Sequence, residues 1–196
     1  MRGKPIVDYN VEMCRKAGIR KVYVLAGPMA EVIQDYYLND KSVTVVKERE
    51  PLGTAGAIAQ FLDGSDDYLV MNGDSVYYVD INKFIEALDR TYCDIVMGVC
   101  QTRDASRFGM VKIRNGYIDS FEEKRRDAEQ GYVSVGLYAF KKKFVMKADG
   151  FQMLETSVFP KEAASKNIKA FEMRWWPVDD PERHAVATKN MAVWNE

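Results

Sequence analysis

One strand-like segment ends in a sharp turn that presents a carboxylate, and this segment constrains the fold most. Residues 68–74 read Tyr-Leu-Val-Met-Asn-Gly-Asp, so four residues suited to a strand lead through a glycine turn to Asp74. In an open α/β sheet, ligands bind beyond the carboxyl ends of the strands. A carboxylate held there suits Mg²⁺, which prefers oxygen ligands and a substrate phosphate. Because the same tripeptide occurs in ordinary turns, this pattern alone makes Asp74 only a candidate ligand.

Helix-like and strand-like segments alternate ahead of this strand. Apolar residues at helical spacing predict helices over residues 5–17 and 29–37, and apolar runs predict strands over 21–26 and 42–46. This alternation is typical of a parallel sheet with crossover helices.

The second half of the chain contains successive strands without intervening helices. Asn115-Gly116 predicts a hairpin, and further strands are expected over 94–100, 132–140 and 167–173. Helices are expected over 154–165 and from about Pro181. We find no repeat and no linker. The sequence therefore predicts a single α/β domain over residues 1–196, with a mixed, mainly parallel sheet.

Composition excludes several classes of function. The net charge of −1 gives no electrostatic case for nucleic acid or an anionic membrane as a partner. There is no apolar run near 18 residues and no signal peptide, so we expect a soluble, cytoplasmic protein. His184 is the only histidine and has no Ser or Cys nucleophile motif beside it, which disfavours a triad hydrolase.

Two glycines flank a threonine where a helix of about residues 55–62 should begin. Gly53, Thr54 and Gly56 belong to the run Pro-Leu-Gly-Thr-Ala-Gly-Ala-Ile at 51–58. Free N–H groups at a helix start, without a Cβ in the way, can approach a base or a phosphate. A plain helix cap explains the spacing equally well.

A series of short motifs makes the chain resemble the sugar-1-phosphate nucleotidylyltransferases almost from end to end. The motifs are Gly3-Lys4-Pro5, Ala17-Gly18-Ile19, the run at 51–58, Asn72-Gly73-Asp74, Arg107-Phe108-Gly109, Phe121-Glu122-Glu123-Lys124 and Val135-Gly136-Leu137-Tyr138. The Phe-Glu-Glu-Lys form and the short gap after it look closest to the D-glycero-D-manno-heptose 1-phosphate guanylyltransferase branch. Glucose- and mannose-1-phosphate enzymes are close alternatives.

The resemblance implies a Rossmann-like, GT-A-like nucleotidyltransferase fold and a particular reaction. A sugar 1-phosphate attacks the α-phosphate of a nucleoside triphosphate in line, and Mg²⁺-pyrophosphate leaves. GTP is favoured only through the heptose branch. The implied cofactor is Mg²⁺, the partners are the two substrates, and a homo-oligomer is possible.

The resemblance also implies roles for individual residues. Asp74 would hold the metal, Glu123 would accept sugar hydroxyls and Lys124 would pair with the sugar phosphate. The implied nucleotide site comprises Pro51, Leu52, Gly53, Thr54, Gly56, Asn72 and Gly73, and the implied sugar site comprises Gly109, Glu123, Lys124, Val135 and Gly136. Without the resemblance, Glu123 and Lys124 would read as a solvated charged turn.

A second metal carboxylate is expected before the last helix. Many members read Asp-Ile-Gly-Thr-Pro-Glu there, which would put Pro177 at the Asp position. The Val-Asp-Thr-Pro-Glu-Asp form of the related CMP-sugar-acid synthetases instead fits residues 178–182 and makes Asp179 the ligand. Asp180 is alternatively a helix cap. We favour Asp179.

The front of the chain departs most from the family pattern. Members begin with a buried strand and a Gly-Gly-x-Gly-Thr-Arg loop that holds the triphosphate, whereas Met1-Arg2-Gly3-Lys4-Pro5 matches a later motif. We therefore expect strands 21–26 and 67–71 to face a gap where the first central strand would lie. Truncation, a segment from a partner, and a closed-up non-catalytic protein are three explanations. We favour truncation of an ordinary enzyme and expect the fragment itself to be weakly active or inactive. The alternative is an impaired nucleotide-binding or regulatory protein.

Overall fold

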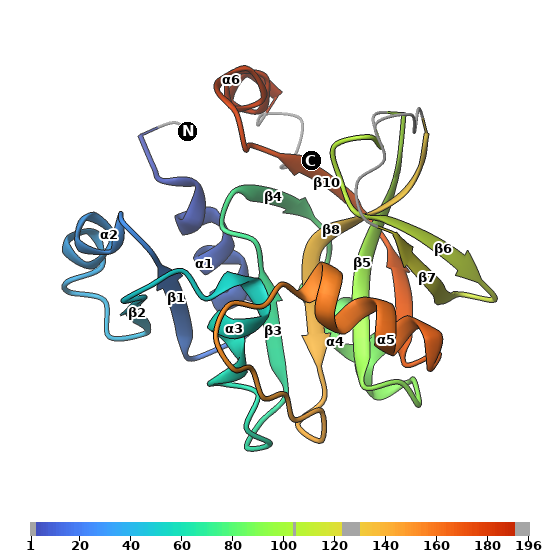
Figure 1. Ribbon diagram of the computed structural model, residues 1–196. Coiled ribbons are helices and arrows are strands. Elements are labelled where there is room, and N and C mark those ends of the chain that lie inside the picture. Colours follow the sequence, from blue (N-terminus) through green and yellow to red (C-terminus); the bar gives the residue numbers. More distant parts are fainter. Residues whose placement is uncertain (1–2, 104, 123–129, 191–196) are drawn as a thin grey trace.

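The computed structural model shows a mixed β-sheet with helices on both faces (Figure 1). It describes residues 3–103, 105–122 and 130–190. The helices are α1 (Ile6–Lys16), α2 (Ala30–Tyr36), α3 (Gly53–Ala59), α4 (Ile81–Asp89), the π-helix η1 (Leu154–Val158), α5 (Phe159–Ala164) and α6 (Pro181–Asn190). The strands are β1 (Val22–Ala26), β2 (Val43–Lys47), β3 (Tyr68–Met71), β4 (Ser75–Tyr78), β5 (Ile95–Thr102), β6 (Met110–Arg114), β7 (Tyr117–Glu122), β8 (Gly131–Phe140), β9 (Ile168–Glu172) and β10 (Arg174–Pro177).

Six strands form the central sheet, in the order β3-β8-β5-β9-β7-β6. The α/β class and the mixed sheet are confirmed. The expectation that parallel pairing dominates is wrong for the described strands, because only β5–β9 and β1–β2 pair in parallel. Strands β5 to β8 follow one another without a crossover helix, and such short connections join antiparallel strands.

Strand β8 is the most deeply buried strand of the central sheet. Tyr138 and Phe140 pack with Phe159 of α5 on one face, and Leu137 packs with Phe84 of α4 on the other. Each of these five side chains is buried. Successive residues of a strand point to opposite faces, so one apolar run can serve both helical layers.

Strands β1 and β2 form a separate two-stranded sheet. Among the described residues, β1 pairs only with β2, and β3 pairs only with β8 on one side. Each of these strands therefore has an unpaired edge among the described strands, whereas a common gap and a further strand that would fill it stay predictions. All four residues of β3 are only half-buried. This is unusual for an apolar strand in the sheet of an α/β fold.

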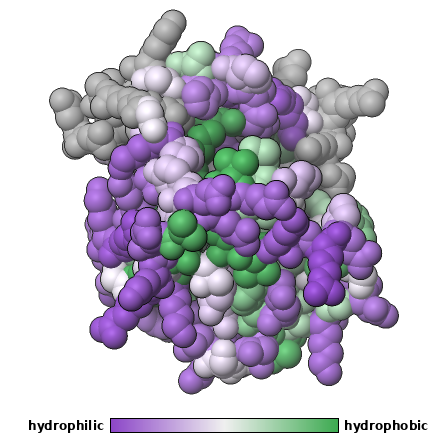
Figure 2. All heavy atoms as spheres, turned by 90° about the vertical axis from the view of Figure 1, so that its left-hand side faces the viewer, coloured by the Kyte–Doolittle hydropathy of each residue, from purple (hydrophilic) through white to green (hydrophobic). Residues whose placement is uncertain are grey.

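The side of the molecule that carries α2 exposes several large apolar side chains. Met29 and Val32 are each 60% exposed and Leu38 is 78% exposed. Figure 2 looks onto this side and shows apolar surface among hydrophilic residues. Helix α2 therefore buries only part of its apolar surface against strands β1 and β2, although Ala30 is fully buried. None of the described helices is long and apolar enough to cross a bilayer.

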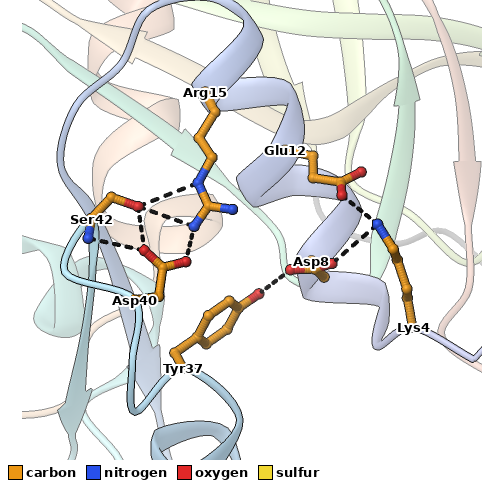
Figure 3. Close-up of polar contacts among 7 residues, drawn as sticks. All are labelled: Lys4, Asp8, Glu12, Arg15, Tyr37, Asp40 and Ser42. Atoms are coloured by element: carbon orange, nitrogen blue, oxygen red, sulfur yellow. Dashed lines mark hydrogen bonds and ion pairs between the residues drawn. The ribbon is translucent and has the colours of Figure 1, made fainter.

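Polar contacts hold α1 against the segment that connects α2 to β2 (Figure 3). Asp8 on α1 is 7% exposed, accepts a hydrogen bond of 3.1 Å from the Tyr37 hydroxyl and lies 3.6 Å from Nζ of Lys4. Two turns further along the helix, Arg15 pairs with Asp40. Burial, and then the Asp8 carboxylate, raises the pKa of Tyr37, so its hydroxyl stays a donor. Helix α1 is therefore fixed near both of its ends.

Replacing Tyr37 by phenylalanine should destabilise the protein by about 1–2 kcal/mol, because the buried Asp8 carboxylate loses its hydroxyl donor. Urea unfolding followed by circular dichroism would measure the loss. Tyr23→Phe is the control, since Tyr23 is 42% exposed and its ring packs on Phe61. Equal stabilities for Tyr37→Phe and the unmodified chain would contradict this assignment.

Candidate active site

Two strand ends that pair with each other carry Asp74 and Asp179. Strands β4 and β10 are antiparallel, with Pro177 opposite Ser75. One residue further, the N–H of Val178 donates to the carbonyl oxygen of Asp74 at 2.8 Å. The two aspartates thus lie on adjacent strand ends although about 100 residues separate them in sequence. Their sharing of one metal ion stays a prediction.

Helix α1 holds the turn that presents Asp74. Nδ2 of Asn10 donates to the carbonyl oxygens of Asn72 and Ser75, at 3.2 Å in each case. Asn10 is 5% exposed, and its buried Oδ1 has no hydrogen-bond partner among the described residues. Sequence reasoning missed this residue. The signal for it was a polar residue on the apolar stripe of the first helix.

The turn also rests on an irregular point of β8, where its register with β5 shifts. Gly136 has a φ of +74°, and a Cβ there would lie 2.3 Å from Nδ2 of Asn72. The carbonyl oxygen of Gly136 accepts hydrogen bonds from the Asn72 N–H at 2.8 Å and from the Tyr77 hydroxyl at 2.9 Å. Burial raises the pKa of Tyr77, so this hydroxyl stays protonated. Gly136 therefore makes room for Asn72, and a contact with a sugar stays a prediction.

The glycines of the predicted nucleotide segment pack against the chain itself. The N–H groups of Ala55 and Gly56 donate to the carbonyl oxygen of Gln152, at 2.9 and 3.2 Å. A Cβ at Gly53 would lie 2.4 Å from that same oxygen. These two N–H groups are therefore engaged within the chain, and a nucleotide role for Gly53 and Gly56 stays a prediction. The absence of a side chain at Gly53 and Gly56 allows the segment before η1 to lie close to this helix start.

Thr54 and Leu52 reinforce this contact. The Thr54 hydroxyl accepts the Leu154 N–H at 2.9 Å and donates to Glu155 at 3.0 Å, and the Leu52 carbonyl oxygen accepts the Gln152 N–H at 2.8 Å. Pro51 precedes them outside the helix. A nucleotide role for Pro51, Leu52 and Thr54 stays a prediction.

Two of the predicted sugar-site residues pack against neighbouring parts of the chain. Gly109 packs on the Phe121 ring, since a Cβ there would lie 2.6 Å from a ring atom. Val135 is 1% exposed in the cluster beneath α4, so it can offer a ligand only main-chain groups. Glu123 and Lys124 lie outside the described residues.

Asp180 caps helix α6. Its Oδ1 accepts the Arg183 N–H at 2.8 Å, and this hydrogen bond, followed by the Arg107 guanidinium, lowers the pKa of Asp180. The alternative in which Asp180 is a cap is thereby confirmed. Asp179 makes a different set of contacts, with Nη2 of Arg107 at 3.3 Å and Nη1 of Arg183 at 3.6 Å.

Asp74 and Asp179 would be the carboxylate ligands of a magnesium ion that also binds substrate. No group of three or more His, Cys, Asp or Glu side chains in the described part of the chain could hold a metal. Mg²⁺ commonly takes only one or two carboxylates and completes its shell with phosphate and water. The Asp74 side chain is exposed and makes no hydrogen bond or ion pair with a described residue. It is therefore available as a ligand.

Gly136→Ala should destabilise the protein by about 2–4 kcal/mol, because the new Cβ strains a left-handed backbone and collides with Asn72. Gly73→Ala is the matched control, since a Cβ at Gly73 meets nothing within 4 Å. It should change stability by less than about 0.5 kcal/mol. Chemical denaturation of both variants compares them, and similar losses would contradict the packing role of Gly136.

Comparisons with known proteins identify the family of this chain. The chain is 30% identical over 182 residues to the D-glycero-alpha-D-manno-heptose 1-phosphate guanylyltransferase of Campylobacter jejuni, covering 90% of this chain and 78% of that protein. It is 27% identical over 197 residues to the mannose-1-phosphate guanylyltransferase catalytic subunit beta of Danio rerio, covering 91% of this chain and 54% of that protein. Among the first curated relatives, the chain spans between 44% and 78% of the relative's own length.

A solved structure has the same fold. HddC from Yersinia pseudotuberculosis, complexed with GMP-PN, superposes with a TM-score of 0.80 at 26% identity, covering 96% of this chain and 86% of that one. The family model described as Nucleotidyl transferase matches residues 1–173. The resemblance to sugar-1-phosphate nucleotidylyltransferases is thus confirmed, and the chain belongs to the nucleotidyl transferase family.

Proposed function

We propose that this protein is a cytoplasmic, single-domain nucleotidylyltransferase that joins a nucleoside triphosphate and a sugar 1-phosphate, giving a nucleotide-sugar and pyrophosphate. The observation that carries the proposal is the hydrogen bond between Val178 and Asp74, which places two aspartates at adjacent strand ends. GTP and a heptose or mannose 1-phosphate are the favoured substrates, because the named relatives are guanylyltransferases for these sugars.

The described residues would divide the work between metal and substrates. Asp74 and Asp179 would hold Mg²⁺, and the ion would screen the negative charge of the phosphates. The segment from Pro51 to Gly56, with Asn72 and Gly73, would line the nucleotide site. Main-chain groups at Gly109, Val135 and Gly136 would face the sugar, together with Glu123 and Lys124.

The reaction needs alignment and charge neutralisation more than a covalent nucleophile. A phosphate oxygen of the sugar 1-phosphate forms a bond to the α-phosphorus, and the bond from that phosphorus to the bridging oxygen breaks. The β- and γ-phosphates leave together as pyrophosphate. The turn that carries Asp74 suits this task, because Asn10, Tyr77 and Gly136 hold it from three elements before any ligand arrives.

Asp74→Asn should lower Mg²⁺-dependent pyrophosphate release from GTP and the sugar 1-phosphate by about 10²–10³-fold, because the neutral side chain no longer attracts the metal. A coupled pyrophosphate assay with heptose and mannose 1-phosphates would measure the rates. Asp119→Asn is the control, since Asp119 pairs with Arg114 at 3.8 Å on the β6–β7 hairpin. Equal activity of Asp74→Asn and the unmodified chain would reject the proposed metal site.

The alternative is a protein that binds nucleotides or nucleotide-sugars without turnover. The named relatives are transferases, so the comparisons give this alternative no support. Calorimetry with GTP and with GDP-mannose, in the presence of Mg²⁺, would separate the two functions. Binding without pyrophosphate release would favour the alternative, and turnover by this chain would exclude it.

A further inference from the structure

Both carboxylate oxygens of Asp179 face an arginine. Oδ2 lies 3.3 Å from Nη2 of Arg107, and Oδ1 lies 3.6 Å from Nη1 of Arg183. Asp179 is the residue that the proposed function assigns to the metal, yet its negative charge is already compensated. Asp74, the other proposed ligand, makes no such contact with a described residue.

A metal ion bound to Asp179 would lie close to positive charge. Mg²⁺ binds a carboxylate oxygen at about 2.0–2.1 Å, so a guanidinium 3.3 Å from that same oxygen would stand next to a divalent cation. Two cations at such a distance repel each other strongly wherever water does not fully screen them. The charge of the nearby arginine therefore opposes metal binding to Asp179, and binding becomes more favourable when one arginine withdraws.

Arg107 is the arginine that can withdraw. Its side chain is 46% exposed and lies on the β5–β6 connection, whereas the Arg183 side chain is 17% exposed. The Arg183 guanidinium also lies over the Phe108 ring, 5.2 Å from its centroid, and such stacking holds a guanidinium in place. Moreover, Arg107 contacts Asp180 at 3.3 Å, so it keeps a partner when it leaves Asp179.

We propose that Arg107 pairs with the Asp179 carboxylate in the metal-free protein and that metal binding displaces it. The released guanidinium then binds a substrate phosphate. This inference rests on the proposed function, since it takes the metal and the phosphate from that reaction. A guanidinium suits the second task because its planar fork matches two phosphate oxygens at once. Metal binding and nucleotide binding would then both favour the position of Arg107 away from Asp179.

The test is a titration of Mn²⁺, alone, into the full chain, with the free ion followed by electron paramagnetic resonance. Arg107→Gln should raise the affinity for Mn²⁺ about two- to fivefold, the size expected for removing a competing exposed ion pair. Calorimetry with GTP in saturating Mg²⁺ should show the opposite change, a loss of affinity of about tenfold, because a charged hydrogen bond to phosphate is missing. A merely structural arginine would not shift the two affinities in opposite directions.

Two variants complete the experiment. Arg107→Lys keeps the positive charge and should leave the Mn²⁺ affinity close to that of the unmodified chain. Arg114→Gln removes an arginine that is 74% exposed on the β6–β7 hairpin and should change neither affinity. If the Mn²⁺ affinity of Arg107→Gln is unchanged or lower, the proposed displacement of Arg107 is rejected, but the proposed metal site is not. If neither chain binds Mn²⁺, both the displacement and the metal site are rejected.

Discussion

The pairing of β4 with β10 is the constraint on which the candidate site depends. Each strand has four residues, and a pair so short is not stable in water by itself. Side chains supply the missing stability: Trp175 donates to the Ser75 hydroxyl at 3.1 Å and packs edge-on against Phe108. The loop that bears Arg107 is therefore joined to the same pair of strands, so the aspartates and the arginine are placed together.

Much of the fold could be predicted from local patterns. Helical spacing locates α1 and α2, and Asn115-Gly116 locates the hairpin, where both residues have positive φ. Strands β4 and β10 could not be found this way, because four residues are too few to show a period and Pro177 ends one of them. The mainly parallel sheet was an extrapolation from the first four elements, and the antiparallel pairs come from the later ones.

The candidate site was predictable by residue type more than by contact. A glycine in the sequence indicates that a side chain is excluded at that position, but it does not identify the neighbour that excludes the side chain. At Gly136 the neighbour is Asn72, and at Gly53 it is Gln152, about 100 residues away. Asn10 was missed for a related reason. A helical stripe indicates which face of the helix is buried, but only the fold shows that the carbonyl oxygens of Asn72 and Ser75 lie there and accept hydrogen bonds from Asn10.

Helix α1 connects the most distant parts of this arrangement. Its Asn10 holds the turn before Asp74, and its Cys14 thiol lies 3.7 Å from the Met71 sulfur of β3. The helix itself is held by buried Asp8 near its start and by Arg15 near its end. Loosening these contacts would release Asn10 from carbonyl groups that only a donor can satisfy, and the turn would lose its support. The polar cluster shown in Figure 3 thus supports the position of Asp74 as well as the stability of the fold.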